Sequence, residues 1–479
     1  MRLERPWNVG LVTLISVIPI FSQNPPVSPE RPWHSPGEHE IAGEARRAGR
    51  SSFRIDAGRI YSLAELIDQA EMHNPETRVA WENARAQAAS LGIARSELYP
   101  TLSALAVSGV DRSEAGSGSR FYRQMVQASQ VSLELSYTVF DFGARRGRID
   151  AAGARVLTAN FGFNNIHRQL IYRVQQAYYR LLNASAQEAA ARASLANAQA
   201  VQQSAEERLK NGLATLPDVL EARSATAQAQ FDLQTILGTE QVTQGDLATV
   251  LGASADSVIR VQPFREVPAP EALQDTVEQI IDRAIAQRPD LQEEVAGIRE
   301  AKAQRKEARA AFYPVLGLFA NPTAEELNLL QQNLPWGHTA DLAGGVALSL
   351  NWTVFDGGAR KNRLAQAEAR IRQTEAQVSA TRDRIEDEVW AAYSNLNTAF
   401  RQREAATALL DAATQSYAAA LESYSYGVRN LLDVTAAQKV LAQARSADIQ
   451  ARTRVLATLS DLAFRAGDLI QVNAKGVKP

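Results

Sequence analysis

A long internal repeat constrains this chain more than any other feature. The sequence HNPE at residues 73–76 corresponds to QRPD at 287–290, and LYP at 98–100 corresponds to FYP at 312–314, both 214 residues apart. Further along, YTVFDFGAR at 137–145 corresponds to WTVFDGGAR at 352–360, at a spacing of 215. Register kept across such landmarks indicates a duplication, so each half is expected to form the same structural unit.

The N-terminus carries the pattern of an export signal. Arg2 and Arg5 precede an apolar run, Val9 to Phe21, that suits a signal-peptide core and is too short to span a bilayer as a helix. The expected organisation is a signal peptide at 1–23, a Pro-rich extended lead-in at 24–58, the first repeat at 59–251, an inter-repeat linker at 252–274, the second repeat at 275–466 and a C-terminal tail at 467–479.

Composition excludes several classes of protein. The formal net charge of -2 leaves no electrostatic excess for nucleic acid, and the absence of cysteine excludes disulfides and thiolate metal sites. The five histidines are scattered without metal-ligand spacing, and no phosphate-binding glycine-rich loop is present. We therefore expect no catalytic site, metal or cofactor.

Both halves permit very long helices. No proline occurs between Pro100 and Pro217 or from Trp336 to Lys478. Residues 143–210 and 358–426 are expected to form helices of roughly 100 Å. Shorter helices are expected at 62–97, 217–251, 275–311 and 431–465. Two short helices stacked end to end match one long helix, which predicts a tubular wall of even height with the linker and the C-terminal tail meeting halfway along it.

A coiled-coil stripe runs along each predicted long helix. Apolar residues recur at spacings of three and four in the first half, and the pattern returns 215 residues later. The stripe consists of Ile166, Leu170, Val174, Ala177 and Leu181, and of Ile385, Val389, Ala392 and Leu396.

Each half also contains a pair of predicted strands. Residues 131–139 and 346–354 alternate apolar and polar side chains, as transmembrane strands do, and Tyr137 and Trp352 suit an interfacial aromatic girdle. Weaker strands precede them at 101–110 and 315–320, and the connections 111–129 and 321–344 are expected to be long outer loops.

Four strands cannot close a barrel by themselves. No later segment has 18 consecutive apolar residues, so a membrane crossing requires strands in a closed barrel. The smallest membrane barrels need about eight strands. The chain is therefore expected to oligomerise, and three copies would supply twelve strands.

These motifs, in order and in duplicate, resemble the TolC-type outer-membrane efflux protein family. The resemblance implies an α+β membrane protein: a trimeric twelve-stranded transmembrane β-barrel, four strands per chain, continued by a long twelve-helix α-barrel with coiled-coil packing. It also implies a passive exit duct in the outer membrane, with its helical tunnel in the periplasm, that serves an inner-membrane pump through a periplasmic adaptor.

The resemblance assigns roles to residues at the helix tips. The residues that would contact the adaptor are Gly212, Leu213, Tyr426, Gly427 and Val428. A purely structural interpretation of the two glycines is that they allow positive φ at helix ends. Residues of the periplasmic aperture would be Asp218, Glu221, Tyr424, Arg429 and Asp433.

Within that aperture, Asp433 would contribute to an acidic ring, whose second acid is replaced by Ala436 here. Tyr424 and Arg429 would tether the closed tip to Asp218, with the arginine reaching a neighbouring subunit, and Pro217 replaces a hydroxyl partner. Both aspartates also suit helix N-caps.

The main alternative is a non-conducting periplasmic coiled-coil scaffold or adaptor, which would share the helical stripe without the strand pairs. Drug, metal and protein export all remain open as the transport task.

Overall fold

The computed structural model describes residues 29–30, 38–47, 53–117, 120–263, 276–331 and 335–468. It divides into two compact units, residues 1–52 and 53–479. In the first unit, helix α1 (Glu38–Arg47) lies within the segment that we expected to be extended. The predicted signal peptide, residues 264–274 of the inter-repeat linker and residues 469–479 of the C-terminal tail lie outside the described residues.

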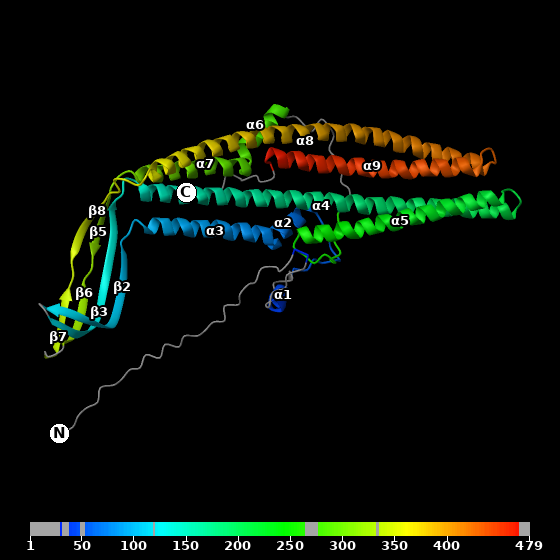
Figure 1. The fold of residues 1–479 in the computed structure, drawn as a ribbon. Coiled ribbons are helices and arrows are strands. Elements are labelled where there is room, and N and C mark those ends of the chain that lie inside the picture. The colour runs from blue at the N-terminus through cyan, green and yellow to red at the C-terminus, as the bar shows by residue number, and fades with distance from the viewer. Residues whose placement is uncertain are drawn as a thin grey trace, which may run out of the picture. The chain divides into compact units, whose positions relative to one another are not determined.

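The second unit has strands at one end and helix hairpins at the other (Figure 1). The first repeat contains α2 (Leu63–His73), α3 (Pro75–Ser96), α4 (Ala144–Lys210) and α5 (Leu216–Val250). The second repeat contains α6 (Val277–Gln287), α7 (Pro289–Ala310), α8 (Ala359–Ser425) and α9 (Leu431–Ala466). In the described part of the chain, no helix combines the length and the apolar content needed to cross a lipid bilayer.

The two long helices are confirmed, and so is their duplication. Helices α4 and α8 are 67 residues each, and both begin after a left-handed glycine, Gly143 (φ 94°) and Gly358 (φ 88°). The apolar stripe is buried in both helices, from Leu170 to Leu181 in α4 and from Ile385 to Leu396 in α8, whereas Ile166 is only partly buried.

The expected single helices at 62–97 and 275–311 are wrong, because a proline divides each of them. Asn74 and Arg288 have extended backbone (ψ 127° and 121°), and new helices start at Pro75 and Pro289. Proline disfavours the helical conformation of the residue before it and lacks the N–H that would continue the hydrogen-bond ladder. The chain therefore bends between α2 and α3 in the first repeat and between α6 and α7 in the second.

Six strands form one antiparallel sheet whose segments align as four strands, as predicted. They are β2 (Thr101–Ser117), β3 (Arg120–Phe140), β5 (Val315–Ala320) with β6 (Thr323–Gln331), and β8 (Val346–Asn351) with β7 (Gly337–Ala343). β3 pairs with β2 on one side and with both β5 and β6 on the other. β7 and β8 complete the sheet beside β6 and β5.

The expected outer loops at 111–129 and 321–344 are wrong. Pairing of β2 with β3 continues from Thr101↔Ser136 to Ser117↔Arg120, and β6 and β7 occupy most of the second connection. Backbone pairing sets how far a strand runs, so polar sequences without alternation remain in the sheet when their ladder partners are present. In the opposite direction, β8 ends at Asn351, short of the predicted Val354.

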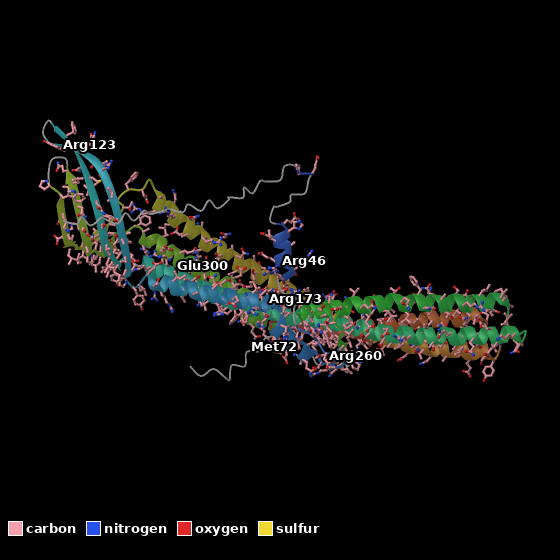
Figure 2. All side chains as sticks on the ribbon, turned by 90° about the horizontal axis from the view of Figure 1, so that it is seen from below. Arg46, Met72, Arg123, Arg173, Arg260 and Glu300 are labelled. Atoms are coloured by element: carbon pink, nitrogen blue, oxygen red, sulfur yellow. The ribbon has the colours of Figure 1, made fainter. Side chains whose placement is uncertain are left out.

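The helices form two levels that meet at the middle of the unit. On the strand side, α3 packs on α4, α4 on α7, and α7 on α8; on the tip side, α4 pairs with α5, α8 with α9, and α4 with α9. Figure 2 shows Met72, Arg173 and Arg260 at the junction between the levels. There β1 (Ile60–Tyr61) and β4 (Arg260–Val261) form a short parallel sheet.

Candidate functional site

The two hairpin turns, between α4 and α5 and between α8 and α9, lie together at the end opposite the strands (Figure 1). Gly212 (φ 71°) and Gly427 (φ 75°) adopt the left-handed conformation after the last helical turns, as the structural interpretation of these glycines predicted. The next amides fold back onto the helices: Leu213 N donates to Arg208 O at 2.8 Å, and Val428 N donates to Ser423 O at 2.9 Å.

The tips present an exposed apolar surface. Leu213, Tyr426 and Val428, all predicted to contact an adaptor, are 69%, 76% and 79% exposed. Three further exposed leucines, which the sequence reasoning missed, lie in the first turns of the returning helices: Leu216, Leu220 and Leu432. We call these six residues the tip patch.

The aperture acids lie at the start of the returning helices, but neither aspartate is an N-cap. Thr215 and Asn430 cap α5 and α9. Asp218 accepts hydrogen bonds from Thr215 N (2.8 Å) and Thr215 Oγ1 (2.7 Å), and these bonds lower the pKa of its carboxyl. Asp433 and Glu221 are exposed.

Tyr424 and Arg429 differ sharply in their surroundings. The Tyr424 ring is buried, and its hydroxyl has no hydrogen-bond partner among the described residues. Burial raises the pKa of that hydroxyl, partly offset by the charge of Arg208. Arg429 is exposed and makes no side-chain hydrogen bond or ion pair within the described part of this chain. Its expected link to Asp218 of a neighbouring subunit stays a prediction.

Arg208, in the last turn of α4, contacts the end of α8 and was not anticipated. Its Nη1 donates to Tyr424 O at 3.0 Å and to Ser425 O at 3.3 Å. The guanidinium carbon lies 4.6 Å from the centre of the Tyr424 ring. The only signal in the sequence was a basic residue in a last helical turn, which is too common to single out, and Ser423 stands at the matching position of the second repeat.

At the other end, a Phe-Asp-x-Gly motif, residues 140–143 and 355–358, lies between the strands and the long helix of each repeat. Asp141 accepts hydrogen bonds from Gly143 N, Arg145 N and Arg145 Nε, and Asp356 does the same with Gly358 and Arg360. Arg145 Nη2 donates to Val139 O in β3, and Arg360 Nη2 donates to Val354 O, three residues beyond the end of β8. The motif therefore fixes the direction in which each long helix leaves the sheet.

Tyr137 and Trp352 both lie near this joint. Tyr137 faces the Arg145 guanidinium, and Trp352 Nε1 donates to Phe312 O at 3.2 Å. Further aromatic rings gather here, including Phe142 stacked on Tyr313. An aromatic belt at a membrane interface fits this placement, and the role of the two residues stays a prediction.

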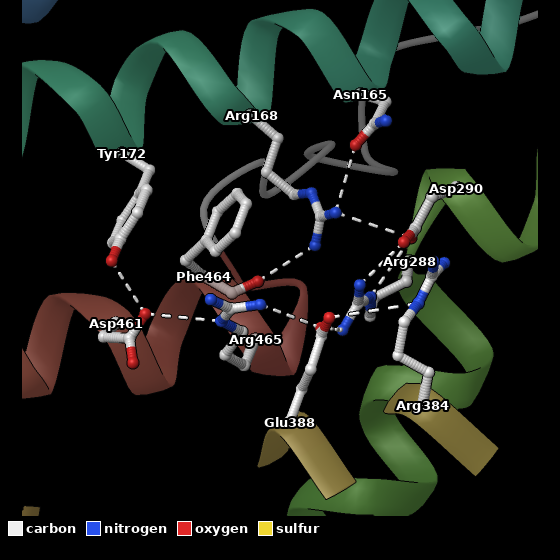
Figure 3. A network of polar contacts seen from close by, with 10 residues as sticks. All are labelled: Asn165, Arg168, Tyr172, Arg288, Asp290, Arg384, Glu388, Asp461, Phe464 and Arg465. Carbon is white, nitrogen blue, oxygen red and sulfur yellow. Dashed lines mark hydrogen bonds and ion pairs between the residues drawn. The ribbon is translucent and has the colours of Figure 1, made fainter. Parts of the chain in front are cut away.

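A buried ionic network joins four helices where the two levels meet (Figure 3). Arg288 donates to Asp290 and to Glu388 (Nη1 to Oε2, 2.7 Å), and Arg465 donates to the same Glu388 oxygen at 3.0 Å. Arg168 of the first repeat donates to Phe464 O at 2.9 Å and pairs with Asp290. Burial lowers the pKa of Arg168 to about 10. The network thus ties the first repeat to the second.

Comparison with known proteins decides what this geometry belongs to. The model of the outer membrane efflux protein family matches twice, over residues 66–253 and 280–468. The protein CyaE of Bordetella pertussis is 30% identical over 432 residues, covering 87% of this chain and 86% of CyaE.

The chain belongs to the outer membrane efflux protein family.

Other relatives agree with this assignment. The outer membrane protein OprJ of Pseudomonas aeruginosa is 26% identical over 449 residues, 91% of each chain. A crystal structure of a membrane protein from Pseudomonas aeruginosa matches with a TM-score of 0.73 and 25% identity, covering 88% of this chain and 97% of that one. VceC of Vibrio cholerae matches at 0.71 with 20% identity, covering 85% and 96%.

The assignment answers several expectations. The α+β fold of TolC-type channels is confirmed. This efflux family member is an outer-membrane export channel with a periplasmic helical tunnel, and it is not an enzyme. The scaffold alternative is thereby set aside. Members of the family function within tripartite systems with adaptors and pumps. The two family matches start 214 residues apart and end 215 apart, which agrees with the duplication.

Proposed function

We propose that three copies of this chain close their sheets into one twelve-stranded barrel and their helices into one twelve-helix tunnel. The trimer is a passive exit duct: an inner-membrane pump and a periplasmic adaptor deliver the substrate at the helix tips, and the substrate leaves through the barrel. The observation that carries the proposal is the sheet, which has two open edges and one apolar face.

The open edges are β2 on one side and the β7 and β8 line on the other. Among the described residues, β2 pairs only with β3, and β8 pairs only with β5. Each edge leaves a row of backbone N–H and C=O groups without partners, which is costly in lipid. A sister chain on each side supplies those partners, and a closed ring of three leaves no edge.

The apolar face continues across all four strands. Directly paired residues share a face of the sheet, and one such row is Leu102, Leu135, Ala320 and Val346. From Val131 to Phe140 this face extends about 30 Å along β3. With the tilt usual in membrane barrels, that length matches an apolar band about 25 Å tall. The adjacent row of paired residues lies on the opposite face of the sheet, and its first two members, Thr101 and Ser136, are polar.

The tip patch supports docking on an adaptor, because six exposed apolar side chains at the far end of long helices form a surface that water solvates poorly. The substrate stays open. Similar proteins include the pyoverdine export outer membrane protein OpmQ of Pseudomonas aeruginosa and the toluene efflux pump outer membrane protein TtgC of Pseudomonas putida. Their named substrates differ in chemistry, so the shared fold does not select among drug, metal and protein export.

The face assignment is tested by placing an arginine on either side of β8. Leu348 lies on the proposed lipid face, and Ala347, its neighbour, lies on the opposite face. Arginine near the centre of the lipid face costs about 2–4 kcal/mol. Leu348→Arg is therefore expected to reduce heat-resistant trimers in the outer-membrane fraction, whereas Ala347→Arg retains them.

Equal insertion of the two variants would contradict the face assignment. A wild-type protein that is monomeric and water-soluble without detergent would overturn the whole proposal. Docking is tested separately by Val428→Asp, which is expected to lower export while the trimer stays heat-resistant. Gln203→Asp, on an exposed position of α4 away from the turn, is the matched charge control.

A further inference from the structure

Near the tips, the side chain of Arg208 links the two hairpins by hydrogen bonds. Its Nη1 lies 3.0 Å from Tyr424 O and 3.3 Å from Ser425 O, both in the last turn of α8. Among the described residues, this is the side-chain hydrogen bond between the α4/α5 and α8/α9 hairpins that lies nearest the tips. The next one towards the middle joins Gln438 to Ser194 O at 3.5 Å.

The chemistry of this contact favours a positive charge. The last carbonyls of a helix have no partner within the helix, and the helix dipole concentrates negative charge there. The guanidinium donates to two of these carbonyls and also faces the Tyr424 ring, which attracts cations. Arg208 is half-buried, so solvent screens the contact less than it screens a surface ion pair.

The other polar side chains that could link the two tips are bonded elsewhere or lack a partner. Asp218 is occupied by Thr215 in the cap of α5, and the Tyr424 hydroxyl has no partner among the described residues. Pro217 carries no hydroxyl. An apolar cluster that contains Ala205, Val219, Tyr424 and Val434 brings the hairpins together without direction-specific bonds.

We propose that Arg208 is the latch that holds the α8/α9 hairpin against the α4/α5 hairpin within one subunit, and that opening of the aperture withdraws its guanidinium from the end of α8. The inference rests on the proposed function, in which the tips surround the aperture. In this mechanism Tyr424 acts through its backbone carbonyl and its ring, and its hydroxyl contributes nothing to the latch.

Single-channel conductance in planar bilayers tests the latch with three variants. Arg208→Ala is expected to shift the balance between open and closed states about tenfold towards open, the effect of losing one charge-assisted hydrogen bond. Arg208→Lys keeps the positive charge but loses the planar guanidinium, so it is expected to restore part of the closed state.

The matched control is Arg223→Ala. Arg223 pairs with Glu206 inside the α4/α5 hairpin and makes no bond to α8 within the described chain, so wild-type conductance is expected. Each variant is first shown to form heat-resistant trimers. Arg208→Ala with wild-type conductance, or Arg223→Ala with the conductance of Arg208→Ala, would overturn the latch.

Hydrogen exchange of residues 420–430 in detergent gives a readout that does not depend on conduction. Tyr424 O also accepts the amide of Gly427, so loss of Arg208 is expected to speed exchange at the end of α8 and in its turn. If the wild type forms no channel, the proposed function fails, and the latch is then decided by exchange alone. Unchanged exchange in Arg208→Ala would reject the latch even in a conducting protein.

Discussion

The two repeats share a backbone path but differ where their first short helix breaks at a proline, Pro75 in one and Pro289 in the other. In the first repeat, Asn74 precedes the break: its Oδ1 accepts from Glu76 N at 2.8 Å, and its Nδ2 donates to Val250 O at 2.9 Å. In the second repeat Arg288 takes this position. Its side chain makes no capping hydrogen bond and joins the buried ionic network instead.

The ion pairs at matching positions differ in sign and in burial. Glu76 pairs with Arg173 at the surface of the first repeat. The corresponding residues of the second repeat are Asp290 and Glu388, two acids that Arg288 bridges, and the Arg288 side chain is only 4% exposed. The two repeats therefore share the helix break, but the polar groups around the break are satisfied by different contacts in each repeat.

A second contrast strengthens this lesson. Both Phe-Asp-x-Gly joints use the same aspartate and arginine, yet Arg145 also donates to Glu97 O, and Arg360 makes no such bond within the described residues. The contacts inside the motif are duplicated because they are local in sequence. Contacts to other elements are not, since they depend on which helix lies alongside.

The largest expected effect tests what the repeats share. Leu170 and Ile385 occupy matching positions in the two apolar stripes, and both are fully buried. Truncation of either to Ala is expected to lower the free energy of unfolding by about 3 to 4 kcal/mol, because it leaves a cavity. Urea unfolding in detergent, followed by far-ultraviolet circular dichroism, measures the loss. Val79→Ala, on an exposed face of α3, is the control; unequal losses at the matched sites would show that the repeats differ in packing as well.

The next effect separates the repeats. Glu388→Ala leaves Arg288 and Arg465 without their shared acceptor and is expected to cost about 3 kcal/mol, as for other broken buried pairs. The matched variant Arg173→Ala breaks an exposed pair and is expected to cost about 0 to 1 kcal/mol. The same unfolding measurement compares them. Similar losses in both variants would remove the distinction between a buried and a surface network.

A smaller effect is expected at the cap of the first repeat. Asn74→Ala removes the cap on Glu76 N and the bond to Val250 O, and it is expected to lower stability by about 1 kcal/mol. Asn74→Asp keeps the oxygen that accepts from Glu76 N and loses the donor to Val250 O, so it separates the contributions of the two hydrogen bonds to stability. Thermal unfolding of the trimer reports both. If Asn74→Ala is as stable as wild type, the break needs no polar cap.

The smallest effect is expected from pH. Burial alone raises the pKa of Asp290, but the hydrogen bonds and charge of Arg288, with the charge of Arg168, leave it below its ordinary value. A lowered folded pKa means that the stabilisation is present above the unfolded pKa of about 4 and is lost as pH falls through the folded value. Unfolding midpoints between about pH 5 and about pH 3 measure this slope. Asp290→Asn is expected to flatten it, and an unchanged slope would place the titration elsewhere.

Much of this architecture follows from the sequence alone. The register of the repeat, the absence of proline across residues 144–210 and 359–425, and the spacing from Leu170 to Leu181 determined two long coiled-coil helices, because these are local periodic properties. Alternation along 131–139 located the membrane-type strand, and two glycines marked the tips. The breaks at Pro75 and Pro289 were missed, although proline acts on its own neighbours and the signal was therefore present in the sequence.

The tertiary structure alone decided the rest. The length of β2 and β3 depends on the partner strand, since polar residues 111–129 show no alternation of their own. Arg208 and Arg168 resemble many other arginines until folding places the end of α8 and Asp290 beside them, 216 and 122 residues away. A side chain that acts across such separations carries no local signature, because its partner is chosen by helix packing and not by its neighbours in the chain.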